Sequence, residues 1–380
     1  MSNYVDRLAS VGPLNRRPLT AVVLAAGEGT RMHSQLPKPL HQLCGRPMIL
    51  YVLDALAELP IDRVVVVVGH GAEQVTKIVH SLAPSHLIVE FVEQPTQRGT
   101  GDAVAVALTA LPDPIENGPD GDVVVLPGDT PLLRPQTLAS LVRLHRESDS
   151  AATLLTAQVY DPTGYGRIVR DKHGEISRIV EDADCDYEES AIDEICTSIY
   201  VFRHSVIGPA LRRLLPTNAQ GEYYLTDTVQ VLAGAGYTVT SQIVDDAMEA
   251  AGVNDRSQLA IAEAELRDRT NARWMMKGVT MLDPERCYVD ASVELEADVL
   301  LLPGTILQGF TRVAKGAEIG PDTRLVDCIV GERSVVADTV GFSAEIGSDA
   351  KVGPFALLNP GSRVADGEIT GPFFQASEES

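Results

Sequence analysis

The spacing of apolar and polar positions divides the chain into three regions, of which the first is the longest. From residue 19 to about residue 250, short β-branched runs alternate with segments of helical periodicity. Two of the runs, residues 64–68 and 123–126, contain no polar position, as expected of central strands buried on both faces. The alternation predicts a mostly parallel α/β sheet with helices on both faces. The predicted strands are 20–25, 63–69, 87–92, 122–127, 152–158, 195–202 and 238–244, and the predicted helices are 47–58, 71–82, 101–111, 135–146, 203–214 and 224–234.

The second region, residues 254–279, is typical of a long linker helix. Asn254 or Asp255 can cap its start. Leu259, Leu266 and Trp274 belong to a rough apolar stripe among charged residues. Because a helix of ~22 residues is ~33 Å long, we expect a stiff spacer between two domains.

In the third region, residues 280–368, apolar residues return at every sixth position. The series runs without a miss from Val289 to Leu325 and resumes from Ile346 to Val364. The 21 residues from Leu325 to Ile346 correspond to three further steps and an insertion of three residues. A period of six fits neither a helix nor a simple hairpin. It fits a parallel β-helix of roughly four coils, in which each hexapeptide supplies one face of a coil.

Composition and charge narrow the functional classes. The chain has 380 residues, of which 44% are hydrophobic and 22% charged, as expected of a globular protein with two or three domains. Its formal charge of −22 argues against non-specific binding of nucleic acid and against docking to an anionic membrane. An anionic substrate must therefore be held by a local cluster of cations or by a metal.

The cysteines and the chain ends favour a cytoplasmic protein. The five cysteines are widely spaced and form no C-x-x-C pair, so we expect reduced thiols and neither a disulfide framework nor a zinc site. Residues 1–18 lack the apolar stretch of a signal peptide and are expected to be a flexible leader, and residues 369–380 a tail. The most apolar short run is far too short to cross a bilayer.

The turn after the first predicted strand carries the most specific motif, residues 24–38 (LAAGEGTRMHSQLPK). A glycine-rich turn between a strand and a helix is how open α/β sheets build a phosphate site. Gly27 and Gly29 allow backbone N–H groups to approach phosphate oxygens. Thr30 adjoins them, and Arg31 and Lys38 add positive charge. The alternative is a tight turn with two solvated cations.

Two further strand ends carry candidate ligand-binding groups. Gln94 follows the third strand, and its amide offers a donor and an acceptor to the edge of a pyrimidine base. Gly99 and Thr100 lie close behind it; the alternative is a simple helix N-terminus. Asp129 ends the fourth strand, where a carboxylate can hold Mg²⁺ against substrate phosphates. Asn254 offers a second oxygen ligand; the alternative is an Asp that caps the next turn.

Together with residues 161–168, 218–227 and 252–254, these motifs resemble those of the sugar-1-phosphate nucleotidyltransferases, and most closely the bacterial N-acetylglucosamine-1-phosphate uridyltransferases that make UDP-N-acetylglucosamine. The resemblance covers residues 19–368. It implies a Rossmann-like nucleotidyltransferase domain (19–253), the linker helix (254–279) and a left-handed β-helix of hexapeptide repeats (280–368). The short gap between Arg31 and Lys38 is similar to that of the uridyltransferases.

The resemblance also implies a reaction and a role for each candidate residue. A sugar-1-phosphate would attack UTP in line, with Mg²⁺ as cofactor and pyrophosphate leaving, in a homotrimer assembled through the β-helix. No G-x-S-x-G or H-E-x-x-H motif is present, which agrees with a reaction that needs no enzyme nucleophile. The implied contacts are Ala26, Gly27, Gln94, Gly99 and Thr100 to uracil; Arg31 and Lys38 to the triphosphate, with Gly29 and Thr30 in the same nucleotide site; Asp129 and Asn254 to Mg²⁺; and Gly166, Glu181, Cys196, Tyr224 and Thr226 to the sugar or its pocket.

This chain departs from the family pattern in two ways. One bears on which sugar phosphate is used, and the other on whether the chain also transfers acetyl groups. Where the family has Glu-x-Asn-Thr-Gly, this chain has Glu194-Ile-Cys196-Thr-Ser198. Loss of the amide costs ~1–3 kcal/mol if its ligand partner stays buried and unpaired, so either binding is weaker or the natural sugar differs. The bifunctional relatives also carry an acetyl-CoA site in later coils that this sequence lacks, so we expect no acetyltransferase activity.

Two alternative functions therefore stay open. The first is a nucleotidyltransferase of specialised metabolism that uses another sugar or cyclitol phosphate, or another nucleoside triphosphate. The second is a catalytically idle trimeric scaffold that binds a nucleotide-sugar.

Overall fold

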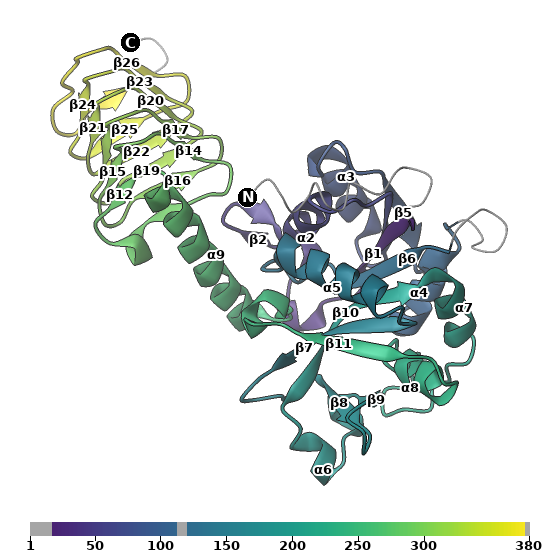
Figure 1. The fold of residues 1–380 in the computed structure, drawn as a ribbon. Helices are drawn as coiled ribbons and strands as arrows, with labels where there is room; N and C mark the ends of the chain where they lie inside the picture. The colour runs from purple at the N-terminus through teal and green to yellow at the C-terminus, as the bar shows by residue number, and fades with distance from the viewer. Residues whose placement is uncertain (1–16, 112–119, 377–380) are drawn as a thin grey trace. The chain divides into compact units, whose positions relative to one another are not determined.

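The computed structural model describes residues 17–111 and 120–376. Most of the expected leader and the last residues of the expected tail lie outside the described residues. The described residues fall into two compact units (Figure 1). The first contains the chain up to His41 and Pro47–Gln258, and the second contains Gln42–Arg46 and the chain from Leu259 onward.

The first unit is built on one sheet with the strand order β11-β7-β10-β6-β1-β4-β5, to which β8 and β9 are attached beside β10. β1 is parallel to β4 and β6, whereas β10 is antiparallel to β6 and β7. The mostly parallel α/β sheet is confirmed, but neither β9 nor the direction of β10 follows from the periodicity. The strands are β1 (Leu19–Ala25), β4 (Arg63–Val68), β5 (Val89–Glu93), β6 (Asp122–Pro127), β7 (Ala152–Gln158), β8 (Gly166–Arg170), β9 (Ile176–Val180), β10 (Glu194–Arg203) and β11 (Val239–Ile243).

Helices cover both faces of this sheet (Figure 1). α2, α3 and α5 pack on one face, and α4, α7 and α8 on the other. In β4, Val64 and Val66 belong to the first core and Val65 and Val67 to the second, because successive side chains of a strand point to opposite faces. The helices are α2 (Met48–Ala57), α3 (Ala72–Leu82), α4 (Thr100–Leu108), α5 (Pro135–Glu147), α6 (Tyr187–Ser190), α7 (His204–Leu211) and α8 (Asp227–Gly234).

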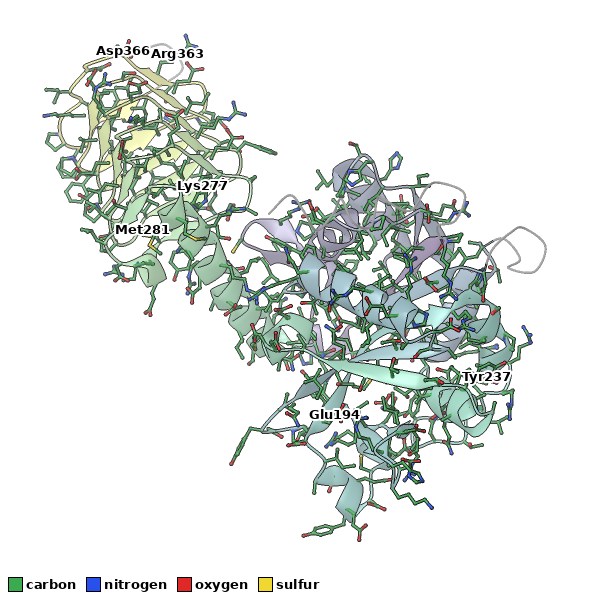
Figure 2. All side chains as sticks on the ribbon, in the orientation of Figure 1. Glu194, Tyr237, Lys277, Met281, Arg363 and Asp366 are labelled. Atoms are coloured by element: carbon green, nitrogen blue, oxygen red, sulfur yellow. The ribbon has the colours of Figure 1, made fainter. Side chains whose placement is uncertain are left out.

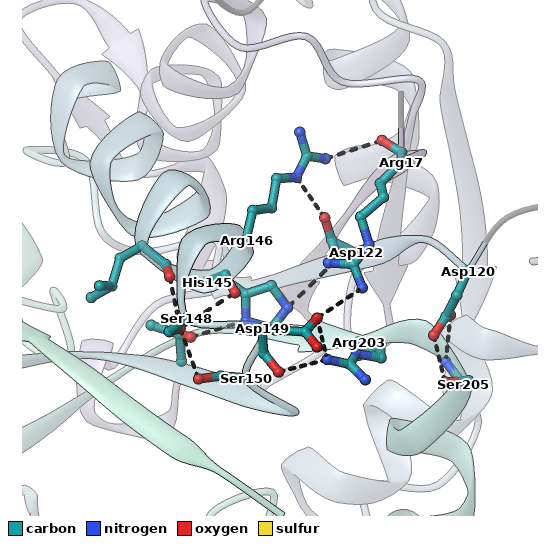
Figure 3. A network of polar contacts seen from close by, with 12 residues as sticks. Arg17, Asp120, Asp122, His145, Arg146, Ser148, Asp149, Ser150, Arg203 and Ser205 are labelled. Carbon is teal, nitrogen blue, oxygen red and sulfur yellow. Dashed lines mark hydrogen bonds and ion pairs between the residues drawn. The ribbon is translucent and has the colours of Figure 1, made fainter. Parts of the chain in front are cut away.

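A buried polar network fixes the amino end of β6 (Figure 3). Asp122, the first residue of β6, accepts a hydrogen bond of 2.7 Å from Arg146 Nε and lies 3.5 Å from His145 Nε2. Burial alone would raise the pKa of Asp122, but the hydrogen bonds from His145 and Arg146 outweigh burial and hold this pKa below its usual value. His145 Nδ1 also lies 2.9 Å from Thr153 Oγ1 of β7. The network therefore ties α5 to β6 and β7.

The second unit contains most of α9 (Arg256–Met276) and of the hairpin formed by β2 (Gln42–Leu43) and β3 (Arg46–Pro47), and a left-handed parallel β-helix. Three sheets of parallel strand pairs form the sides of the β-helix. Their strands are β12 (Thr280–Met281), β15 (Leu300–Leu301), β18 (Glu318–Ile319), β21 (Val335–Val336) and β24 (Lys351–Val352); β13 (Tyr288–Val289), β16 (Ile306–Gln308), β19 (Arg324–Val326), β22 (Thr339–Phe342), β25 (Ala356–Leu358) and β27 (Gln375–Ala376); and β14 (Glu294–Leu295), β17 (Arg312–Val313), β20 (Ile329–Val330), β23 (Glu345–Ile346) and β26 (Arg363–Val364).

The six-residue series is confirmed, since all its apolar members from Val289 to Leu325 and from Ile346 to Val364 are buried in one core. The interpretation of the stretch between the two runs was wrong. Its inward positions are Val330, Val336 and Gly341, so the chain takes four steps there, and three of them are shortened to five residues. A search for apolar residues misses Gly341 because Leu325 and Cys328 fill the space that its side chain would take.

The β-helix is also longer than expected. Two of its sheets contain five described strands and the third contains six, in place of roughly four coils. β27 pairs with β25 and lies within the stretch expected to be a tail. The outer face of the five-stranded sheet that contains β23 and β26 carries ion pairs such as Arg363–Glu345 at 2.7 Å (Figure 2 labels Arg363).

The five cysteines are free thiols, and four of them are buried. None of the helices in residues 17–111 and 120–376 combines the length and the apolar character that a membrane crossing requires.

Candidate active site

A cavity of about 440 Å³ opens in the first unit where the chain leaves the carboxyl ends of β1 and β6. Such an edge is where open α/β sheets carry ligand sites. The predicted site residues that line it are Ala26, Gly27, Arg31, Lys38, Gln94, Gly99, Thr100, Asp129, Gly166, Glu181, Cys196 and Asn254. We call one end of the cavity the glycine-turn end (residues 24–38 and 94–102) and the other the hairpin end (residues 164–166, 181 and 196–198).

At the glycine-turn end, two glycines shape the turn after β1. A Cβ on Gly27 would meet no atom within 4 Å, so this residue borders open space. Gly29 has φ +62°, and a Cβ there would lie 2.7 Å from Lys38 Cβ. Glycine meets both the conformational and the steric requirement. Neither Gly29 nor Thr30 lines the cavity; Thr30 is exposed and begins the short 3₁₀ turn η1 (Thr30–Met32). Arg31 is exposed at the cavity rim.

Gln94 is held in place by its own amide nitrogen. This atom donates to Asp102 Oδ2 at 2.8 Å and to the Gly99 carbonyl at 3.3 Å. The amide oxygen is then the atom with which Gln94 can accept a hydrogen bond from a ligand N–H. Gly99 has φ +106° and packs against the Tyr223 carbonyl, and Thr100 Oγ1 accepts the backbone N–H of Leu225 at 3.0 Å.

Three residues from distant parts of the sequence meet in the middle of the cavity. Lys38 Nζ donates to Asn254 Oδ1 at 2.7 Å and forms an ion pair with Asp129 Oδ2. The Val253 N–H donates to the Asp129 carbonyl at 2.9 Å, which joins the two segments. A Cβ on Gly252 would lie 3.5 Å from Asp129 Oδ1, so this glycine leaves room for the carboxylate. The predicted proximity of Asp129 and Asn254 is observed.

These residues fit a magnesium ion in the chemistry of their donor atoms. A carboxylate and an amide oxygen are hard ligands of the kind that Mg²⁺ prefers, and the Lys38 ammonium already places a positive charge between them. Among the described residues, no group of three or more His, Cys, Asp or Glu side chains is arranged to hold a metal. An ion at this point would therefore take its remaining ligands from phosphate oxygens and water, as Mg²⁺ commonly does.

At the hairpin end, Glu181 provides a carboxylate. Its Oε1 accepts a hydrogen bond of 2.9 Å from Thr226 Oγ1. Burial raises the pKa of Glu181; the hydrogen bond from Thr226 opposes this shift, and the charge of Asp227 adds to it. A Cβ on Gly166 would lie 2.9 Å from Ile179 Cγ2 and 3.4 Å from Glu181 Oε2, so this glycine leaves space beside the carboxylate.

Two arginines attach the β8–β9 hairpin that carries Gly166. The buried Arg167 guanidinium donates to the Tyr165 carbonyl and, at 2.8 Å, to Asp182 Oδ1. Arg170 donates to both oxygens of Glu194, at 2.7 and 2.9 Å (Figure 2 labels Glu194). These bonds fix the hairpin to β10 and to the segment after Glu181.

Tyr224 and Thr226 do not line the cavity, in contrast to their predicted place in the sugar pocket. Thr226 acts from behind, through its hydrogen bond to Glu181. Tyr224 lines a second cavity of about 650 Å³, which shares Glu181 with the first. Burial, followed by the charge of Asp184, raises the pKa of Tyr224 to about 12.

Cys196 lies at the hairpin end, but its thiol points into the protein. The Cys196 Sγ atom lies 3.1 Å from Tyr200 Oη, and burial raises the pKa of Cys196 to about 12. Ser198 and Tyr165, which the sequence did not single out as site residues, also line the cavity. An indication was available for Ser198, because a serine there replaces the glycine that the resembled family has at this position.

The cavity as a whole suits a polyanion beside a ligand rich in hydroxyl groups. Lys38 and Arg31 supply positive charge at its centre and rim, and Asp129 and Asn254 supply oxygen ligands. Glu181 offers a hydrogen-bond acceptor at the other end.

Comparison with known proteins assigns the family. Residues 21–221 match the family described as MobA-like NTP transferase domain. "Bifunctional protein GlmU" of Heliobacterium modesticaldum is 42% identical over 356 residues, which cover 94% of this chain and 75% of that protein. The proteins of the same name from Streptomyces coelicolor and Thermobifida fusca are 44% identical over 365 residues and 48% identical over 332 residues, and the matches cover 96% and 87% of this chain and 74% and 68% of theirs.

These matches confirm the resemblance inferred from the motifs, and they extend through both units. The chain therefore belongs to the GlmU family of sugar-1-phosphate nucleotidyltransferases.

Proposed function

We propose that this enzyme transfers the uridylyl group of UTP to N-acetylglucosamine-1-phosphate or a close relative, with Mg²⁺ as cofactor, and releases pyrophosphate. The convergence of Lys38, Asp129 and Asn254 between the two ends of the cavity carries this proposal. A donor nucleotide at the glycine-turn end and a sugar phosphate at the hairpin end would meet at this point. We assign the transfer to residues 19–253 together with Asn254.

In this reaction an oxygen of the sugar phosphate forms a bond to the α-phosphorus of UTP. The bond from that phosphorus to the oxygen of the leaving pyrophosphate breaks, and no proton transfer is required. Lys38 neutralises charge on the α-phosphate, and Arg31 does so at the exposed end of the triphosphate. When bound by Asp129 and Asn254, Mg²⁺ would supply Lewis acidity and charge neutralisation to the phosphates.

The glycine-turn end would hold the uridine. The amide oxygen of Gln94 can accept the N3–H of uracil, because the amide nitrogen already donates to Asp102 and Gly99. Ala26, Gly27 and Thr100 would border the base and the phosphates. Alignment of the two substrates, rather than a nucleophilic side chain, would supply much of the rate.

The hairpin end would hold the sugar. Glu181, fixed by Thr226, can accept hydrogen bonds from sugar hydroxyls, and Gly166 leaves room beside it. The Cys196 thiol, which points to Tyr200, supports a second candidate: transfer to another sugar or cyclitol 1-phosphate, with UTP or another nucleoside triphosphate. The cation pair and the oxygen ligands in the cavity argue against an idle scaffold.

The assay is release of pyrophosphate from each of the four common nucleoside triphosphates with a panel of sugar-1-phosphates and Mg²⁺. We expect turnover with UTP and N-acetylglucosamine-1-phosphate. Turnover with a different sugar only would favour the second candidate, and no release across the panel would contradict both. Release of free thiol from acetyl-CoA with glucosamine-1-phosphate tests the expected lack of acetyl transfer.

We further propose a homotrimer that assembles through the β-helix and acts in the cytoplasm, where UTP is made and used. Exposed apolar side chains on the β-helix, such as Phe310, Phe355 and Phe373, support association. Light scattering coupled to gel filtration would give the mass of three chains if this proposal holds, and the mass of one chain if it does not.

A further inference from the structure

β10 carries an irregularity where it borders the hairpin end. Its pairing with β7 shifts register between Cys196 and Ile199, so Thr197 and Ser198 form a bulge. The Thr197 hydroxyl turns inward and donates to the Leu155 carbonyl at 2.7 Å. Ser198 is exposed, between the buried Thr197 and Ile199, and lines the cavity. Bulges of this kind re-aim a side chain beside an active site.

The backbone of Ser198 has a conformation that favours glycine. Its φ is +60°, in the left-handed region that residues with a Cβ visit infrequently. A serine at this position is therefore less favourable for folding than a glycine would be. Strained residues of this kind are found at active sites and ligand clamps, and Ser198 is the one among the described positive-φ residues with a Cβ that lines the cavity.

The neighbouring Cys196 has its polar atom engaged within the protein. Its Sγ lies 3.1 Å from Tyr200 Oη and accepts the Ser198 N–H at 3.4 Å. Both Cys196 and Tyr200 are almost completely buried. The thiol therefore forms part of the inner wall, and the hydroxyl of Ser198 is the polar side-chain group that the bulge presents to the cavity.

We propose that Ser198 determines specificity for the acceptor, because its hydroxyl forms a hydrogen bond with a hydroxyl group on the acceptor's ring. Cys196 supports the bulge and does not contact the acceptor. This inference rests on the proposed function of the cavity. It places the acceptor ring between Ser198 and Glu181, both of which line the hairpin end. A neutral, polyhydroxylated ring fits this pair, because a hydroxyl can donate to the carboxylate and also exchange a hydrogen bond with serine.

The test compares Ser198→Ala, Ser198→Gly and Cys196→Ser with the wild-type enzyme, on the acceptor that the wild type uses best. Ser198→Ala should raise the KM for the sugar phosphate about tenfold, the effect of losing one hydrogen bond of about 1.4 kcal/mol, and leave the KM for UTP within about twofold. Ser198→Gly should show the same change in KM and a higher Tm, because it removes the strained side chain. Cys196→Ser keeps a partner for Tyr200 and should leave the KM for the sugar phosphate within about twofold.

The opposite effects of Ser198→Gly on Tm and on acceptor binding separate a ligand contact from a purely structural role. An unchanged KM in both Ser198 variants would overturn this inference and leave the proposed function intact. A larger change of KM in Cys196→Ser than in Ser198→Ala would also overturn it. If the wild type turned over none of the sugar phosphates, both the proposed function and this inference would fail.

Discussion

The two ends of the cavity differ in whether backbone or side-chain groups form their surface. At the glycine-turn end, shape comes from the backbone: Gly29 and Gly99 adopt positive φ where the chain approaches Lys38 and Tyr223, and Gln94 is fixed by groups of the same end. At the hairpin end, the surface consists of side chains on a two-stranded extension and a bulge, with Glu181 and Ser198 among them. We therefore expect the first arrangement to tolerate fewer substitutions than the second.

From this difference we expect that the acceptor can change without a change in the chemistry of transfer. The proposed cation site of Lys38, Asp129 and Asn254 lies between the two ends and depends on main-chain contacts such as Val253 N–H to Asp129 O. This chain has Cys196 and Ser198 where the resembled family has Asn and Gly. This difference alters the wall of the hairpin end and leaves the central residues unchanged. We therefore expect changes at the centre to affect kcat, and changes at the hairpin end to affect the KM of the acceptor.

The largest effect is expected for Asp129→Asn. Loss of the carboxylate removes a proposed metal ligand and should lower kcat about 10³-fold, the upper range for one electrostatic contact in a site. Steady-state release of pyrophosphate measures it. Asp245→Asn, on an exposed residue of the same unit, is the matched control and should behave as wild type. A fall of less than tenfold would contradict the place of Asp129 at the reaction centre.

Lys38→Met should follow, with a fall in kcat of about 10²-fold and a change of less than about threefold in the KM of the sugar phosphate. The reason is that the ammonium faces the centre of the cavity and not the hairpin end. Lys172→Met, in the exposed turn between β8 and β9, controls for the loss of one positive charge. A change confined to the acceptor KM would break the proposed division between centre and hairpin end.

Gly29→Ala tests the backbone construction of the glycine-turn end. The new Cβ would meet Lys38 Cβ at 2.7 Å in a residue with φ +62°, so we expect kcat/KM to fall about tenfold and stability to drop by about 1–3 kcal/mol. Gly236→Ala, with φ +81° and no atom within 4 Å of a Cβ, carries the same backbone strain without the clash. Equal loss of activity in both variants would show that the close approach to Lys38 does not matter.

The smallest effect on catalysis is expected for Glu181→Gln, about a fivefold rise in the KM of the acceptor. This change should also alter the dependence of stability on pH. Burial raises the pKa of Glu181 in the folded protein, so its contribution to stability is complete below the unfolded pKa and is lost as the pH rises through the folded pKa. Glutamine does not ionise. The variant should therefore gain stability relative to wild type as the pH rises through that window, as measured by urea unfolding.

Glu175→Gln, on an exposed residue of the β8–β9 turn, is the control for the pH series. A difference between Glu181→Gln and wild type that stays constant with pH would contradict the shifted pKa.

The sequence best predicts those structural features that a local pattern encodes, such as a periodic spacing of apolar residues or a glycine in a turn. Unbroken apolar runs locate the central strands because both faces are buried, and the six-residue period locates the β-helix because every coil repeats the same inward position. The proximity of Asp129 and Asn254 follows from a strand end and a family motif. The inward Gly341 is missed because the pattern searches for apolar residues and neighbouring side chains fill its place.

The hairpin end is less predictable, for physical reasons. The bulge at Thr197 and Ser198 arises from the pairing of β10 with β7, which is a tertiary contact with no local pattern. The same bulge leaves the Cys196 thiol bonded to Tyr200, where the sequence suggested a sugar contact. Tyr224 lies two residues from Thr226, yet Tyr224 lines the second cavity, whereas Thr226 lines neither and bonds to Glu181, which borders both.

The central claim, that Lys38, Asp129 and Asn254 mark one cation site, is tested most directly by titration with Mn²⁺ followed by electron paramagnetic resonance, in the presence of α,β-methylene UTP. We predict that, with the wild type present, one ion per chain binds at least about tenfold more tightly than it binds to the nucleotide alone. The affinity should fall at least about tenfold in both Asp129→Asn and Asn254→Ala. Wild-type affinity in both variants would contradict the account.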